Sequence, residues 1–298
     1  MMHTQQNKLS ALRYTALAAA VCLWQAASAH ALVVEVEITN NASSNGVAIT
    51  PVWAGFHDGS FDSYNGGLSS QEGLERIAED GNTSVLSADF LGGYTYIDAG
   101  TSAKVLSSQA GADRIDGTIA SAGPPPITPG ESTSQLFTID IDGSNRYFFY
   151  ASMVLPSNDY YIANGNPTAH DLMSLYDGNG SITFNVGLAG TVNDAGTEVN
   201  DFATSAGNGL FPGRGLPAGQ GGPNVGADEN GVNTNVANPF AGFLNSAGVD
   251  LTGLNFNDTG LYPNGIATIT ITAVPEPSTL LLTGLGLVGI LSFTRKKH

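Results

Sequence analysis

The chain has 298 residues, of which 26 are acidic and ten are lysine or arginine, so its formal net charge is −16. This charge disfavours nucleic-acid binding, and a charged fraction of only 12% fits neither a coiled coil nor a charge-rich disordered protein. A hydrophobic content of 42% together with 38 glycines points to a folded β protein with many turns.

The first 29 residues have the order of a secretory signal peptide. Lys8 and Arg13 precede an uncharged run, residues 14–27, that is dominated by alanine and leucine. An Ala-Ser-Ala site follows, which predicts cleavage after Ala29. The alternative, a membrane anchor, needs a longer apolar run. Cleavage would also remove the one cysteine, so the mature chain is expected to hold no disulfide and no cysteine-bound metal.

Alternating apolar and polar residues indicate strands at both ends of the remaining chain. The alternation covers residues 34–38 and 267–273, and has the period of a strand with one face in a core. Residues 136–141 and 147–155 flank a hairpin-like turn signal. The second of these segments is apolar on nearly every residue, which predicts a central strand covered on both faces. Residues 182–188 form another alternating segment. Four weaker candidate strands lie at residues 47–53, 84–86, 94–97 and 115–120.

One short helix is predicted from about Ser70 to Asp80. Ser69 is placed to cap it, Glu72 stands three residues later as in a capping box, and Gly81 is placed to end it. Many short strands with one helix predict an all-β fold, an antiparallel two-sheet β-sandwich of about eight strands.

Residues 207–239 are rich in glycine and proline and have scarcely any apolar periodicity. Such a segment cannot bury enough surface to offset its ordering entropy. We therefore expect a long Gly-rich loop, a surface excursion or a partly disordered stretch, inserted before the last strand.

Four acidic residues in predicted turns are candidate metal ligands. Asp159 follows the central strand, and Asp194 and Glu198 lie in a short turn after another strand. If those strand ends are neighbours, three carboxylates converge, and calcium prefers oxygen ligands gathered on loops. Asp177 is a candidate fourth ligand. The alternative for all of them is that aspartate beside glycine simply caps turns.

Three segments, at residues 49–81, 151–161 and 194–198, resemble a spondin domain. The first contains a proline-bearing strand, His57 and a helix that ends in Ala-Glu-Asp-Gly; the second contains Pro-Ser-Asn-Asp-Tyr, and the third reads Asp-Ala-Gly-Thr-Glu. The resemblance implies an eight-stranded sandwich similar to calcium-dependent lipid-binding domains, as found in matrix adhesion proteins. It further implies a metal site at one end. The chain departs from the animal pattern at Tyr160, where tryptophan is usual, and at Glu198, where aspartate is usual.

A hydrolase is the alternative function class. Asp159 with Asp194 can in principle carry out glycoside hydrolysis, which uses two carboxyl groups. The sequence has no Gly-x-Ser-x-Gly and no His-Glu-x-x-His motif. We interpret His57 as a structural hydrogen-bonding residue beside Asp58.

The C-terminus carries a second targeting signal, in addition to the predicted signal peptide. Pro275, Glu276 and Pro277 precede a 17-residue uncharged run, residues 278–294, which a basic cluster closes. The run is at the lower limit for spanning a bilayer. This order closely resembles the PEP-CTERM sorting signal of Gram-negative bacteria. The resemblance implies recognition by an exosortase-type enzyme, removal of a transmembrane helix and delivery to the outer surface. A plain C-terminal anchor is the alternative.

The sequence thus predicts a signal peptide over residues 1–29, a spondin-like sandwich over 30–273 and a sorting signal over 274–298. Residues 30–275 hold five basic and 25 acidic residues, a net charge near −20 that favours divalent cations. We expect an exported, non-enzymatic adhesion or structural module of the cell surface, outer membrane or biofilm matrix, supported by calcium. Its expected partners are the sorting enzyme and an extracellular polysaccharide or surface protein, with no nucleic acid and only transient membrane association. The alternative is a secreted carbohydrate-active hydrolase.

Overall fold

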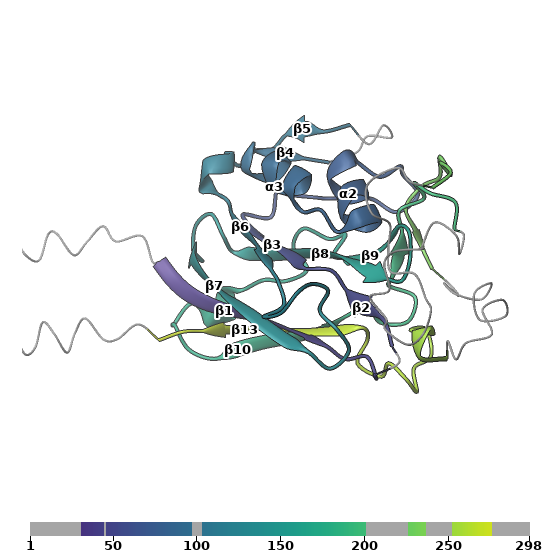
Figure 1. The fold of residues 1–298 in the computed structure, drawn as a ribbon. Coiled ribbons are helices and arrows are strands. Elements are labelled where there is room, and N and C mark those ends of the chain that lie inside the picture. The colour runs from purple at the N-terminus through teal and green to yellow at the C-terminus, as the bar shows by residue number, and fades with distance from the viewer. Residues whose placement is uncertain (1–30, 45, 97–102, 201–225, 237–251, 276–298) are drawn as a thin grey trace, which may run out of the picture. The chain divides into compact units, whose positions relative to one another are not determined.

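The computed structural model describes residues 31–44, 46–96, 103–200, 226–236 and 252–275. Two antiparallel sheets pack face to face, and two helices cover the outer face of the larger sheet (Figure 1). The strands are β1 Ala31–Asn40, β2 Ala48–Ile49, β3 Val52–His57, β4 Tyr94–Thr95, β5 Val105–Leu106, β6 Ile115–Ile119, β7 Ser132–Asp140, β8 Tyr147–Leu155, β9 Tyr160–Ala163, β10 Ser181–Val186, β11 Asn193–Asp194, β12 Thr234–Asn235 and β13 Ala267–Ala273. The helices are α2 Glu72–Asp80 and α3 Ser84–Leu91. The all-β sandwich predicted from the sequence is confirmed.

The smaller sheet joins the two ends of the domain. Its strand order is β10-β13-β1-β7, and β1 pairs with β13 in a register that sets Val36 opposite Ile271. From Val34 to Ile38 and from Ala267 to Ala273 the apolar side chains are buried, whereas their threonine and glutamate neighbours lie on the other side of the sheet and are more exposed. The alternation in the sequence therefore predicted both strands and their buried face.

The larger sheet is buried on both sides. Its order is β12-β11-β9-β8-β3-β6, with β2 paired to β8. In β8, Phe148 and Tyr150 contact the core between the sheets, while Phe149 and Ala151 contact the helices. This two-sided burial confirms that the nearly continuous apolar segment is a central strand.

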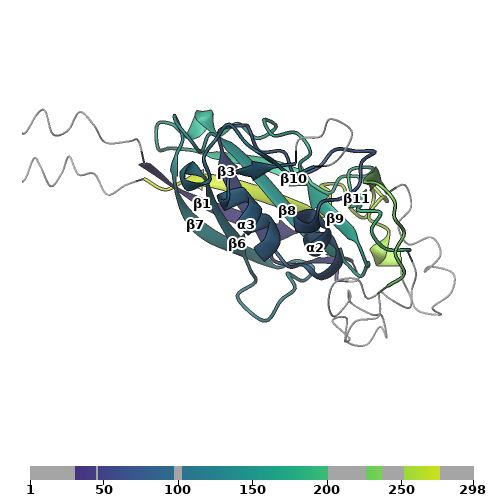
Figure 2. The same ribbon diagram turned by 90° about the horizontal axis from the view of Figure 1, so that it is seen from above.

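The helix layer packs around Trp53. This fully buried indole lies at centroid distances of 5.1 Å from Phe90 and 5.5 Å from Phe149, and its Nε1 donates to Asp116 Oδ2 at 2.8 Å. Leu74 and Ile77 of α2 bury against the same cluster. The helices thus form a third layer, seen from above in Figure 2.

Three local predictions were wrong. Residues 84–86, expected as a weak strand, begin helix α3, because Leu86 and Phe90 lie one helical turn apart and bury in the same cluster. The described chain therefore has two α-helices where the sequence predicted one. The turn after β7 closes no hairpin, since β7 pairs in the smaller sheet and β8 in the larger.

The third correction concerns the start of α2, where Gln71 and not Ser69 is the N-cap, without a side-chain cap. Ser69 instead donates to Gly231 O at 3.4 Å, and Ser70 donates to Asn233 Oδ1 at 2.7 Å. Gly81 ends the helix in the left-handed conformation, with φ of 69°, as predicted.

Several predictions lie on residues that the structure does not describe. These are the signal peptide with its site at Ala29, most of the Gly-rich segment 207–239, and the sorting segment from Glu276 and Pro277 onward. Within the described part of the chain, no helix has the length and apolarity needed to cross a membrane.

Candidate metal centre

Strand pairing brings Asp159 and Asp194 together. Asp159 directly precedes β9, and Asp194 is the last residue of β11. The two strands pair antiparallel with Asp194 opposite Tyr160, so the carboxylates lie side by side at the strand ends. The two aspartates predicted as ligands therefore lie together, although the strands that bring them together are β9 and β11 and not the ends of the predicted strands 147–155 and 182–188.

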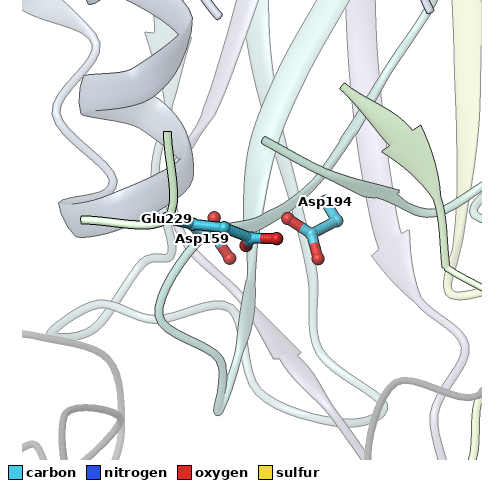
Figure 3. A group of neighbouring side chains, drawn as sticks. All are labelled: Asp159, Asp194 and Glu229. Carbon is cyan, nitrogen blue, oxygen red and sulfur yellow. The ribbon is translucent and has the colours of Figure 1, made fainter. Parts of the chain in front are cut away.

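A third carboxylate arrives from the Gly-rich segment. Residues 226–231 return along residues 196–199, with backbone hydrogen bonds from Val199 N to Ala227 O at 2.8 Å and from Glu229 N to Thr197 O at 3.0 Å. This return places Glu229 beside the other two acids. One carboxylate oxygen from each of Asp159, Asp194 and Glu229 lies within 4.8 Å of the others. Figure 3 shows the three side chains gathered at one place.

Asp159 is the buried member of the group and is held from one side only. Its Oδ2 accepts hydrogen bonds from the backbone N–H of Thr197 and of Glu198, each at 3.1 Å. Its Oδ1 is buried and has no hydrogen-bond partner among the described residues. The side chain is fully buried, at 0% exposure. An unpaired buried carboxylate oxygen is costly, which marks this atom as a position for a further ligand.

Each of the neighbouring carboxylates makes it harder for the others to ionise. Burial and the neighbouring Asp194 raise the pKa of Asp159 to about 8, although the two backbone donors oppose this shift. Burial and Asp194 also raise the pKa of the more exposed Glu229. Like charges crowded at a buried position favour the neutral acid until a cation compensates them.

Asp194 is fixed by its own turn. Its Oδ1 accepts the N–H of Gly196 at 2.7 Å, and its Oδ2 accepts the side-chain amide of Asn200 at 2.6 Å. Each carboxylate oxygen has a second lone pair, so these bonds orient the carboxylate and leave it able to bind a cation.

The other two predicted ligands lie elsewhere. Glu198 is fully buried beside Asp159, but its Oε1 accepts the N–H of Gly226 at 3.1 Å and its carboxylate is not in the group of converging oxygens. Asp177 is also outside the group. It is exposed and lies before β10, whereas Asp194 lies after β10. Glu229 was missed, although Asp228 and Glu229 are the only acidic residues between 207 and 239.

The surroundings of the group are acidic. A cavity of about 310 Å³ borders Gly196 and Thr197, and its charged lining residues among those described are Glu75 and Asp228. Burial and the neighbouring Glu79 and Glu72 raise the pKa of Glu75. This end of the domain therefore attracts cations and repels anions.

His57 has the structural role expected for it. Its Nδ1 accepts the backbone N–H of Gly59 at 3.0 Å, and the ring is fully buried. Burial and the nearby Arg114 lower its pKa to about 3, so it is neutral at physiological pH.

Comparison with known proteins identifies one segment. Residues 273–296 match the PEP-CTERM protein-sorting motif. No curated protein matches the chain. The PEP-CTERM motif marks an exported protein that an exosortase sorts and that is anchored at the surface of a Gram-negative bacterium. The predicted export and sorting enzyme are therefore confirmed, whereas the resemblance to spondin domains rests on the three sequence segments alone.

Proposed function

We propose that this protein is a non-enzymatic adhesion or structural module of the bacterial surface or biofilm matrix, with a calcium ion held by Asp159, Asp194 and Glu229. The spondin-like segments support this proposal, because two of the three contain the aspartates of the group. The ion would stabilise the loops at this end of the sandwich and keep them ready for a partner.

The observation that carries the proposal is the buried Oδ1 of Asp159. It has no hydrogen-bond partner in the described chain, and carboxylate oxygens of Asp194 and Glu229 lie within 4.8 Å. Oxygen-only ligands on loops suit calcium, which completes its shell of six to eight oxygens with carbonyl groups and water. A turn-capping role accounts for one oxygen of Asp159 but not for the other.

The same geometry speaks against the hydrolase alternative. A general acid must reach the glycosidic oxygen of its substrate, and the carboxyl group of Asp159 is fully buried.

Calcium titration of the purified protein, followed by calorimetry and thermal melting, tests the proposal. We expect binding that raises the Tm, and a loss of both effects in Asp159→Asn, because the amide lacks the charge that the ion needs. Asp177→Asn is the matched control, since this exposed aspartate lies outside the group.

Two results would contradict the proposal. One is an unchanged Tm at saturating calcium, and the other is equal calcium binding in the two variants. Turnover of a polysaccharide panel that Asp159→Asn abolishes would instead support the hydrolase.

A further inference from the structure

A second site lies on the neighbouring residues of β11 and β12. It is a cavity of about 470 Å³. Its lining side chains are those of Tyr64, Asn65, Asn193, Asn233, Thr234 and Asn235, and three glycines complete it. No charged and no aliphatic side chain belongs to the lining among the described residues. Four amides in one cavity are unusual because ligand pockets are mostly apolar.

Hydrogen bonds fix the walls of this cavity in advance. Asn233, only 1% exposed, donates from Nδ2 to Leu68 O at 2.7 Å and accepts at Oδ1 from Tyr161 at 2.8 Å. Asn193 donates to the Tyr64 hydroxyl at 3.0 Å. The Tyr64 ring meets Tyr161 edge-on, with centroids 5.4 Å apart. A site whose polar groups are already oriented loses little freedom on binding.

The exposed groups of the cavity are able to both donate and accept. Thr234 and Asn235 are exposed and Asn65 is half-buried. A side-chain amide offers two donors and one acceptor oxygen, and a threonine hydroxyl offers both functions. Ligand hydroxyl groups also donate and accept, so a ligand with several hydroxyl groups satisfies this set of side chains.

Charge limits the ligand further. The domain carries a net charge near −20 by sequence, and Asn65 itself donates to the carboxylate of Asp62 at 3.3 Å. No described basic residue lines the cavity to hold an anion. Phosphorylated or uronic ligands are therefore disfavoured, and a neutral ligand fits.

The cavity is separate from the metal group. Asn193 and Asp194 are successive residues of one strand, so their side chains point to opposite faces. None of the three converging carboxylates lines the cavity.

We propose that this cavity binds a neutral saccharide, a sugar unit of an uncharged polysaccharide, independently of calcium. Export and surface anchoring place the cavity where such polymers occur. Amides and hydroxyls recognise the sugar hydroxyl groups, while the Tyr64 ring supplies apolar surface for the carbon atoms of the sugar.

The test is calorimetric titration of the full-length protein with neutral oligosaccharides of glucose, galactose, mannose and N-acetylglucosamine. Oligogalacturonate is the anionic comparator. The variant chosen to obstruct the cavity is Gly66→Leu, because residue 66 lines it and a Cβ there meets no atom within 4 Å, so the fold tolerates the added side chain. Gly123→Leu is the matched control, since a Cβ there is equally free and residue 123 is outside the cavity.

We expect at least one neutral oligosaccharide to bind, Gly66→Leu to raise its Kd by roughly tenfold or more, and Gly123→Leu to leave it unchanged. We also expect oligogalacturonate to bind more weakly. Absence of binding across the neutral panel, or equal affinity in the two variants, would overturn the proposal.

Measuring saccharide binding with and without calcium tests this proposal separately from the proposed calcium site. Saccharide affinity is expected to be the same in EDTA and in calcium, and the same in Asp159→Asn as in the wild type. If calcium fails to bind, the saccharide result still stands. Loss of saccharide binding on chelation would overturn the proposal, because it would assign recognition to the carboxylates.

Discussion

The backbone N–H of Glu198 donates to Asp159 Oδ2 at 3.1 Å, so the residue expected to supply a carboxylate supplies an amide. The Glu198 side chain turns to Gly226 N instead. This hydrogen bond joins the turn after β11 to the returning segment 226–236, the segment that delivers Glu229. Glu198 therefore supports the group indirectly, by holding together the two chain segments that form it.

Stability of the calcium-free protein is expected to fall as the pH rises from about 4 to about 8. In the folded chain burial and Asp194 raise the pKa of Asp159 to about 8, whereas an unfolded aspartate titrates near 4. Between these values the folded state holds one proton more than the unfolded state, so raising the pH favours unfolding. Urea denaturation over a pH series should show this slope, and a smaller one in Asp159→Asn. Identical slopes would contradict the assignment.

Calcium is expected to reverse this trend. Binding requires the ionised carboxylate and therefore releases the Asp159 proton below pH 8. The Tm increase caused by calcium should grow as the pH rises from 6 to 8, as melting curves with and without EDTA would measure. A calcium effect that is constant over this range would indicate that the ion binds elsewhere.

Glu229→Gln is expected to weaken calcium binding by roughly tenfold or more, because one of three charged ligands is lost. Asp228→Asn is the matched control, since Asp228 is also exposed and lies one residue away, outside the converging group. Calorimetric titration of both variants measures the difference. Equal losses would indicate a general effect of negative charge and would remove Glu229 from the site.

Gly81→Ala is expected to destabilise the fold by about 1–3 kcal/mol. Gly81 has φ of 69°, and a Cβ there would lie 2.6 Å from Cγ2 of Thr50. Gly66→Ala serves as the control, because its Cβ meets open space at a φ that alanine accepts. Urea denaturation of both variants gives the free energies of unfolding. A neutral Gly81→Ala would mean that the end of α2 adjusts freely.

Deletion of residues 274–298 is expected to release the protein into the medium, because the PEP-CTERM motif is what the exosortase recognises. Cell fractionation and immunoblotting of the host measure the distribution. A matched variant with Pro275 and Pro277 replaced by alanine tests the motif without removing the apolar run. Unchanged surface display of both would contradict the role of the signal.

Strands were predictable where one face is buried. In β1 and β13 every second residue is apolar, and the burial pattern follows that alternation. Helix α3 was not predictable, because the apolar side chains among its eight residues are too closely spaced to form an apolar stripe along one face of a helix. Its place is set by contact of Leu86 and Phe90 with the cluster around Trp53, a residue more than 30 positions away.

Two of the three members of the candidate metal centre were predictable from the sequence. The sequence placed Asp159 and Asp194 in turns after predicted strands, and the pairing of β9 with β11, which was not predicted, brings them together. Glu229 lies in a segment without apolar periodicity, and the backbone hydrogen bonds that join residues 227–231 to residues 196–199 place it. The amides of the second cavity come from separate stretches of chain, so no local motif indicates them.

The antiparallel pairing of β1 with β13 has a mechanical consequence. Val34 lies opposite Ala273, and Val274 N donates to Val33 O at 2.8 Å. The described chain therefore begins and ends at the same end of the sandwich (Figure 1). Figures 1 and 2 place β9 at the opposite end of the sandwich, and Figure 2 shows β11 beside it. A molecule tethered through Pro275 would hold its two candidate sites outward from its attachment. A pull between a captured polymer and the tether would then run along β13, which is flanked by β1 and β10. Such a load shears many ladder hydrogen bonds at once instead of opening them one after another, which is the resistant geometry for a protein under tension.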